Sequence, residues 1–299
     1  GIPYITEYIS TYEGNQIAPS RDEVENNRDS IMADISAGLS LLQEDFNDAS
    51  KQFITTHAAQ ALKARVALYF EDWETAKNAA LNVVNSDSFQ VATVSEYFNT
   101  WANDAAVNSI FELAFSTTDN LDFNSLSNIY RGSDYGDIEV LDNLLTIFDE
   151  DDIRIDSRMI GYEKIEEKEL LRNLGKYPSA NYSDNVSLIR YEEVILTLAE
   201  AKLELGENDA LQYLNLIPAQ RNAMPYKKAT KENILKERRR EFCFEGFRFD
   251  DLARTGQDIP LVSLKQTHGG PEYGSYKFAF PIPVAELNAN PKMEQNSGY

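Results

Sequence analysis

The chain has 299 residues, enough to bury a hydrophobic core as one large domain or two fused ones. Its 49 acidic and 28 basic residues give a formal net charge of -21, and this negative field would repel nucleic acid and sulfated glycans. Its longest apolar runs fall far short of the ~20 residues that a membrane-spanning helix needs. The single cysteine, Cys243, excludes an internal disulfide.

The first expected elements are a helix and then a helical hairpin. Ser20 and Glu23 form a capping-box pattern, and apolar residues recur after them at helical spacing, which predicts a helix over residues 21–42. Residues 57–69 and 74–84 are alanine-rich helical stretches with only a short break between them. This pattern predicts a hairpin like a tetratricopeptide unit.

A second hairpin of the same kind is expected later in the chain. It comprises residues 188–205 and 209–220, with Gly206 where a helix C-terminus favours glycine. The two hairpins begin at residues 57 and 188, whereas tandem repeats of this class recur about every 34 residues. A long insertion therefore separates them.

The insertion begins with a short strand-like run at residues 110–115. Residues 116–187 follow and are rich in Asn, Asp, Ser, Gly and Tyr. A polar segment of this length within a compact domain is typically functional or disordered. After the second hairpin we expect a helix over residues 234–247, a short helix over 250–254, and a proline-containing loop to the end. The fold class is therefore mainly α.

Several segments resemble landmarks of the SusD/RagB family, in the family's order. Residues 234–252, ILKERRREFCFEGFRFDDL, resemble its signature helix. Further family landmarks are similar to residues 188–194 and 199–201, to the Asp152-Ile153-Arg154 run and to the ending from Phe280 to Tyr299. The resemblance covers essentially the whole chain and implies one SusD-like domain over residues 1–299, with hairpins at about 55–86 and 188–222, a variable ligand-loop region at about 116–187, and the signature helix and tail at 230–299.

The resemblance also implies a function. Family members are surface-exposed lipoproteins of the outer membrane in Bacteroidetes, lie on a SusC-like TonB-dependent transporter and capture oligosaccharides or, in some members, peptides. It therefore implies a glycan-binding protein without a cofactor. The family pattern begins upstream with a lipoprotein signal, a lipidated cysteine and further helices. We accordingly expect that the start at Gly1 is trimmed and that the lipid anchor is absent from this chain.

The sequence contains no motif that marks a catalytic or metal site. Glycosidases need a pair of carboxylates, but no local pattern singles out a pair. His57 and His268 have no nucleophile partner in sequence, and nucleophile-elbow, P-loop and HExxH motifs are absent. The four carboxylates at residues 149–152 lack the spacing of a calcium loop. We interpret them as a solvated turn in which Asp152 pairs with Arg154, and we expect no enzyme.

The signature helix is interpreted as a core helix rather than a ligand site. Its acids and arginines face one another at helical neighbour spacing, and phenylalanines supply an apolar face. Such arginines pair with buried acids, so truncating Arg239 should cost stability and not affinity. Cys243, between Phe242 and Phe244, is interpreted as an unreactive core thiol.

Ligand contacts are expected from aromatic and planar polar side chains of the insertion. Aromatic rings cover the C–H faces of a neutral sugar, while amide, carboxylate and guanidinium groups bond its hydroxyls. A single tyrosine more often packs a loop onto helices, so the prediction concerns the group, and Trp101 is its weakest member. Trp73 is interpreted as a core residue, and Asn181 accompanies the tyrosines. The predicted ligand-binding residues are Tyr130, Arg131, Asp134, Tyr135, Tyr162, Tyr177, Tyr182 and Trp101.

Two other functions remain open from the sequence. A peptide-binding relative of the same fold would offer a groove with main-chain partners. A protein-interaction scaffold built on helical hairpins would have no concave aromatic surface in the insertion.

Overall fold

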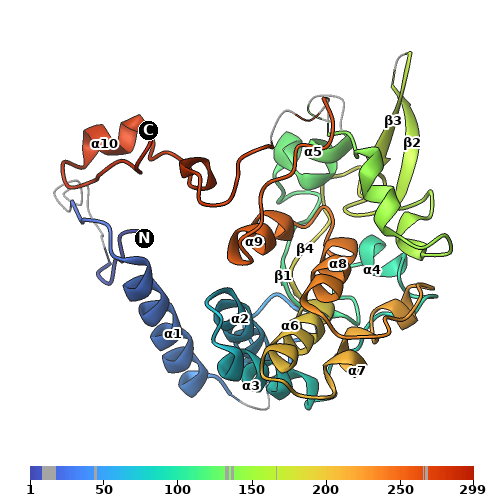
Figure 1. Cartoon of the computed structure of the whole chain (residues 1–299), viewed down its shortest axis with the longest axis horizontal. Coiled ribbons are helices and arrows are strands. Elements are labelled where there is room, and N and C mark those ends of the chain that lie inside the picture. The colour runs from blue at the N-terminus through green and yellow to red at the C-terminus, as the bar shows by residue number, and fades with distance from the viewer. Residues whose placement is uncertain are drawn as a thin grey trace. The chain divides into compact units, whose positions relative to one another are not determined.

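The computed structural model describes residues 1–8, 18–43, 46–131, 135, 138–165, 167–264, 266 and 269–299 (Figure 1). The chain consists of two compact units. One contains Gly1–Ser40 with Phe249–Tyr299, and the other contains Leu41–Arg248. The organisation of residues 1–299 as one SusD-like domain stays a prediction.

The second unit begins with the predicted helical hairpin, which is confirmed. Helix α2 (Thr56–Tyr69) and helix α3 (Trp73–Val84) pack against each other through buried alanines. Small side chains let two helix backbones approach closely, which explains the alanine-rich sequence. Trp73 is half-buried beneath the ammonium group of Lys231, whose Nζ lies 4.8 Å from the ring centroid.

Thr55 stabilises the start of α2, since its hydroxyl accepts a hydrogen bond from the backbone N–H of Ala58 at 3.2 Å. We expect Thr55→Ala to lower the free energy of unfolding by about 1 kcal/mol, the usual cost of losing an N-cap. Urea denaturation measures this loss, and Thr55→Ser, which keeps the hydroxyl, is the control. Equal stability of the alanine variant and the parent would contradict the capping role.

The second hairpin differs in part from its prediction. Residues 188–190 belong to strand β4 (Val186–Arg190), which pairs antiparallel with β1 (Ser109–Leu113), so the helix predicted from residue 188 begins three residues later as α6 (Tyr191–Glu204). The following helix, α7 (Ala210–Leu214), ends six residues before its predicted end at residue 220. Pro218, which lacks a backbone N–H, instead opens a 3₁₀ turn.

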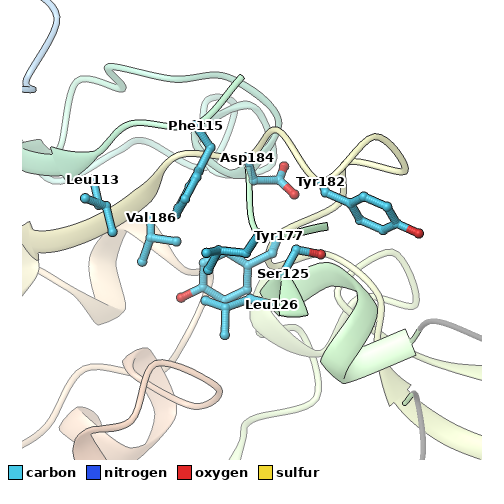
Figure 2. A pocket seen from close by; sticks show the side chains of 9 residues that line it. Leu113, Phe115, Ser125, Leu126, Tyr177, Tyr182, Asp184 and Val186 are labelled. Carbon is cyan, nitrogen blue, oxygen red and sulfur yellow. The ribbon is translucent and has the colours of Figure 1, made fainter. Parts of the chain in front are cut away.

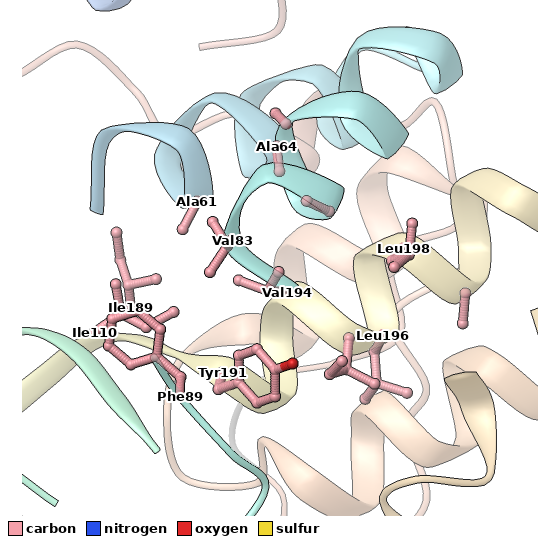
Figure 3. Close-up of a cluster of buried hydrophobic side chains, with 14 of the residues drawn as sticks. Ala61, Ala64, Val83, Phe89, Ile110, Ile189, Tyr191, Val194, Leu196 and Leu198 are labelled. Carbon is pink, nitrogen blue, oxygen red and sulfur yellow. The ribbon is translucent and has the colours of Figure 1, made fainter. Parts of the chain in front are cut away.

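Helix α6 is the centre of the main hydrophobic core (Figure 3). Its first twelve residues are buried on every side, because α3, α7 and the signature helix all pack against it. Ile110 of β1 and Ile189 of β4 bring the small sheet into the same core. The core thereby joins the two hairpins across the insertion.

The part of the chain between the two hairpins contains a second, smaller core. The elements of this part, besides β1 and β4, are α4 (Asn99–Ala102), α5 (Leu126–Arg131), 3₁₀ turns at Asp122–Asn124, Asp142–Ile147 and Ile153–Ile155, and a hairpin of β2 (Ile160–Ile165) and β3 (Lys168–Asn173). The buried members of this core are Tyr97, Val140, Met159, Ile160 and Leu171.

The signature helix is shorter than predicted. Helix α8 (Lys231–Glu241) ends six residues before the predicted end, and α9 (Phe247–Arg254) begins where the first helix was expected to finish. Phe244 and Gly246 adopt φ angles of 69° and 87°, and this left-handed backbone cannot continue an α-helix. The turn separates the two helices.

The interpretation of the signature helix as a core element is confirmed. Glu237 and Glu241 are fully buried, and Arg154 donates hydrogen bonds to both. The same guanidinium also pairs with Asp152 at 2.7 Å, as predicted. The prediction of a solvated turn is wrong at Asp152, however, because this residue is only 2% exposed. Ion pairs continue from Arg154 through these carboxylates to further residues. The connected group, here called the buried ionic network, includes Asp152, Arg154, Lys176, Arg190, Glu192, Arg221, Glu237, Glu241 and Glu245.

Cys243 and Arg239 lie next to the buried ionic network in the sequence. Burial raises the pKa of the Cys243 thiol, which agrees with an unreactive core cysteine. Arg239 is half-buried, in contrast to Arg238 and Arg240, which are buried. The predicted cost of truncating Arg239 stays a prediction.

The other unit contains the chain ends. Helix α1 (Val24–Leu41) lies within the predicted range of residues 21–42. The tail, expected as loop, also forms a 3₁₀ turn at Tyr276–Phe278 and the short helix α10 (Val284–Ala289), whose N-cap is Pro283. Among the described residues, no helix combines the length and apolar composition that crossing a membrane requires.

Candidate functional site

A cleft of about 170 Å³ opens beside β1 and α5 in the larger unit. Figure 2 shows Leu113, Phe115 and Val186 on one side of this cleft and Tyr182 on the other. They come from the end of β1, the segment before α5 and the run that leads into β4. The described residues that line it, here called the aromatic cleft, are Leu113, Phe115, Leu121, Ser125, Leu126, Tyr177, Tyr182, Asp184 and Val186.

Tyr177 lines the aromatic cleft but is only 5% exposed, because other aromatic rings pack against it from behind. The Tyr130 ring stacks on it with centroids 6.2 Å apart and planes 2° from parallel. Trp101 meets Tyr177 edge-on, with centroids 5.9 Å apart. Burial raises the pKa of Tyr130 to about 12 and also raises that of Tyr177, so both phenols stay protonated at neutral pH. The Tyr130 hydroxyl donates a hydrogen bond to the carbonyl oxygen of Phe244 at 2.8 Å.

Both cleft tyrosines have unusual backbone conformations. Tyr177 and Tyr182 have φ angles of 60° and 62°, in the left-handed region that non-glycine residues rarely adopt. Arg131 donates to the carbonyl oxygens of Asn173, Lys176 and Tyr177, which fixes the first of these turns. Seven other described non-glycine residues also have positive φ angles, so these two angles mark tight turns and do not by themselves indicate binding.

Lys176 connects the aromatic cleft to the signature helix. Its ammonium donates to the carbonyl oxygen of Glu241 at 2.8 Å and to the carboxylate of Glu245 at 2.5 Å. Its Nζ also lies 4.6 Å from the Trp101 ring centroid, within the range of a cation–π contact. The residue before Tyr177 is therefore held by the buried ionic network.

Asp184 is the one carboxylate among the described residues that line the aromatic cleft. Its carboxylate accepts hydrogen bonds from the backbone N–H of Ser179 at 3.0 and 2.9 Å. Burial raises its pKa, whereas the Ser179 N–H and the charge of Arg131 act in the opposite direction. The carboxylate gives the cleft a strong hydrogen-bond acceptor beside its apolar walls.

A smaller polar chamber adjoins the cleft and shares Tyr177 and Asp184 with it. Its volume is about 30 Å³, enough for one or two water molecules. The Nε1 atom of Trp101, which is one of its lining residues, is buried without a hydrogen-bond partner among the described residues. The other residues that line this polar chamber are Thr100, Asn103, Asp104, Ala106, Asn108, Ser109, Glu112, Asn185, Ser187 and Arg190.

Comparison with known proteins identifies the family. The family model described as "SusD family" matches residues 92–299, which include the aromatic cleft and the buried ionic network. The chain belongs to the SusD family. The starch-binding protein SusD from Bacteroides thetaiotaomicron is 36% identical to this chain over 126 residues, which cover 40% of this chain and 23% of that protein. The SusD-like protein P38 from Formosa agariphila is 23% identical over 367 residues, covering 100% of this chain and 70% of that protein.

Solved structures agree with the family assignment. A putative sugar binding protein from Bacteroides vulgatus superposes with a TM-score of 0.85 at 28% identity, covering 100% of this chain and 70% of the other. A SusD superfamily protein from Bacteroides thetaiotaomicron gives a TM-score of 0.83 at 28% identity, covering 99% and 70%. The predicted mainly helical, SusD-like fold is confirmed, and the chain spans about 70% of the length of these structures.

The SusD-family fold brings together only part of the predicted ligand-binding set. Tyr177 and Tyr182 line the aromatic cleft, and Trp101 lines the polar chamber. Tyr130 and Arg131 lie behind Tyr177 and support it. Tyr135 and Tyr162, which are 50% and 61% exposed, line neither cavity. Asp134 lies outside the described residues. Ligand binding by the set stays a prediction.

Several residues of the aromatic cleft were not predicted from the sequence. Leu113 and Phe115 alternate along β1 and its continuation, so a period of two places their side chains on one face. That alternation was a usable signal. Asp184 had no comparable signal beyond its place in the tyrosine-rich run after Tyr177, and Ser125 precedes α5 as an ordinary polar residue.

Proposed function

We propose that this SusD-family chain binds glycans, with one sugar unit of an oligosaccharide entering the aromatic cleft. The observation that carries the proposal is the convergence of Tyr177, Tyr182 and Asp184 on one cavity. Tyrosine faces cover the apolar C–H surface of a sugar, and the carboxylate accepts bonds from its hydroxyls. The names of two relatives, a starch-binding protein and a putative sugar binding protein, support the same ligand class.

The volume of the aromatic cleft limits the size of the ligand that it can enclose. This volume of about 170 Å³ is below the ~300–1,000 Å³ that pockets for whole small molecules occupy. One unit of a longer chain fits this space better than a complete oligosaccharide does. Weak binding is expected, because ordering a flexible ligand offsets much of the contact energy.

The wider role in this proposal follows from the family. In this role the chain is part of a surface-exposed lipoprotein of the outer membrane, which captures nutrients for a SusC-like TonB-dependent transporter. It binds its ligand and does not cleave it. What supports this role is the match of the SusD family to residues 92–299.

Peptide binding is the second candidate function. The aliphatic walls of the cleft, formed by Leu113, Leu121, Leu126 and Val186, also suit an apolar peptide side chain. In that case contacts to the ligand main chain would supply most of the affinity. A scaffold function based on the helical hairpins would not require the aromatic cleft.

A glycan-array and calorimetry screen tests the proposal on the full chain. Neutral plant and host oligosaccharides form one ligand class and a peptide mixture the other. Tyr182→Ala, at a half-exposed position, should weaken binding of the selected glycan roughly tenfold, equivalent to about 1.4 kcal/mol. Tyr162→Ala is the matched control, because Tyr162 lies on the exposed face of β2 outside both cavities.

The outcomes separate the candidates. Loss of glycan binding in Tyr182→Ala with parental binding in Tyr162→Ala supports the cleft. The reverse pattern would place the ligand on the β2–β3 hairpin and reject the cleft. Binding of peptides alone would replace the proposal with the second candidate.

A further inference from the structure

The charges around the two cavities are almost all negative. None of the described residues that line the aromatic cleft is a lysine, arginine or histidine. Asp184 lines both cavities, and Asp104 and Glu112 line the polar chamber. The one cation among the described lining residues of the chamber is Arg190. A ligand in either cavity therefore faces carboxylates.

Arg190 is already neutralised by its own partners. Its guanidinium donates to both carboxylate oxygens of Glu245 at 2.8 Å, to Glu192 at 3.0 Å and to Glu241 at 3.2 Å. Only 4% of the residue is exposed. A guanidinium held by these carboxylates has little remaining attraction for a ligand anion.

The carboxylates are less fully compensated. Asn185 joins two of them: its backbone N–H donates to Asp104 at 3.2 Å and its amide to Glu112 at 2.8 Å. These partners are neutral, so they satisfy hydrogen bonds without removing charge. Asp104 also acts electrostatically on Asp184 and disfavours its ionised form. Arg131 opposes this effect and keeps its charge, because its guanidinium donates to three neutral backbone carbonyl oxygens. It lines neither cavity, so a ligand there meets the carboxylates first.

We infer that the site accepts uncharged sugar units and rejects uronic acids and sulfated sugars, with Asp184 as the residue that determines this specificity. The inference rests on the proposed glycan-binding function and adds the charge class of the ligand. A ligand anion near Asp184 in a partly desolvated cleft meets strong like-charge repulsion. We expect acidic oligosaccharides to bind about a hundredfold more weakly than neutral ones of equal length.

The experiment compares neutral gluco-, xylo- and galacto-oligosaccharides with oligogalacturonides and sulfated galactan oligosaccharides of matched length. Calorimetry on the full chain gives each affinity. Asp184→Asn keeps an acceptor for the Ser179 N–H but removes the charge, so it should raise the affinity for acidic ligands about tenfold relative to neutral ones. Asp87→Asn makes the same charge change at an exposed turn away from both cavities and should leave that ratio at the parental value.

A second variant keeps the inference testable if Asp184→Asn does not fold, as judged by thermal melting. Asp104→Asn alters an exposed chamber residue and should shift the acidic-to-neutral ratio in the same direction by a smaller factor. Raising the salt concentration should also narrow the difference in the parent protein, because salt screens charge repulsion.

Two failures are distinguishable. Acidic ligands that bind the parent as tightly as neutral ones, or a ratio that neither charge variant changes, would overturn the inference and leave glycan binding intact. Absence of binding to neutral and acidic glycans alike would reject the proposed function itself.

Discussion

Replacing Glu241 with glutamine is expected to lower the free energy of unfolding by about 3–5 kcal/mol. The carboxylate of Glu241 is completely buried and accepts hydrogen bonds from Arg154 at 3.1 Å, Arg190 at 3.2 Å and Arg221 at 3.0 and 3.1 Å. Glutamine fills the same volume but carries no charge. The variant would leave three buried guanidinium groups with less compensating charge, which is far more costly than losing a surface ion pair.

Urea denaturation of Glu241→Gln and the parent measures this effect. Lys236→Ala is the control, since Lys236 is an exposed residue of the same helix and should change stability by no more than about 0.5 kcal/mol. Equal destabilisation by the two substitutions would show that the buried ionic network contributes no more than the exposed surface of α8.

The stability difference between Glu241→Gln and the parent should depend on pH. Burial favours the neutral form of Glu241, but the positive charges of Arg221, Arg190 and Arg154 outweigh it and hold the pKa well below its ordinary value of 4.5. A carboxyl whose pKa is lowered by folding adds stability above its unfolded pKa and loses that contribution as pH falls through its folded pKa. The glutamine variant lacks this titration.

We therefore expect a constant difference near neutral pH and a decreasing one below about pH 4.5, with a slope of at most about 1.4 kcal/mol per pH unit. Urea denaturation of both proteins at a series of pH values gives the difference directly. Other carboxylates titrate in both proteins, so the effect of the -21 net charge largely cancels. A difference that stays constant or grows between pH 6 and pH 3 would contradict the lowered pKa.

The same network bears on the candidate site. Lys176 bonds to the Glu241 carbonyl and to the Glu245 carboxylate, and Tyr177 follows it directly. Loss of the network would therefore disturb the aromatic cleft as well as the core. For this reason the binding experiments use cleft and surface variants and leave the network unchanged.

Local patterns in the sequence were sufficient to predict the first hairpin. The alanines of α2 and α3 recur at helical spacing, and the break between the helices has Glu71 at a φ of 59° and Asp72 as the N-cap of α3. Each of these signals depends on residues within a few positions of one another. The landmark segments identified the family for a similar reason, because they are contiguous runs.

Pairing between distant segments decided the elements that were predicted wrongly. Leu188 to Arg190 continue the helical pattern of α6, yet Ile189 and Arg190 pair with β1, where Ser109 is the partner of Arg190. The end of α8 at Glu241 depends on the left-handed turn at Phe244, whose carbonyl oxygen accepts the Tyr130 hydroxyl. The hydrophobic periodicity of one segment does not reveal which distant segment will pair with it.

The sequence by itself therefore determined the helical class, the first hairpin, the ion pair between Asp152 and Arg154 and the tyrosine-rich insertion. Only the tertiary structure decided which tyrosines reach a common cleft: Tyr177 and Tyr182 do, whereas Tyr135 and Tyr162 do not line it. The reason is that the bonds that orient Tyr177, from Arg131 to residues 173–177 and from Lys176 to Glu241 and Glu245, join positions 42 to 69 residues apart, beyond the range of any local pattern.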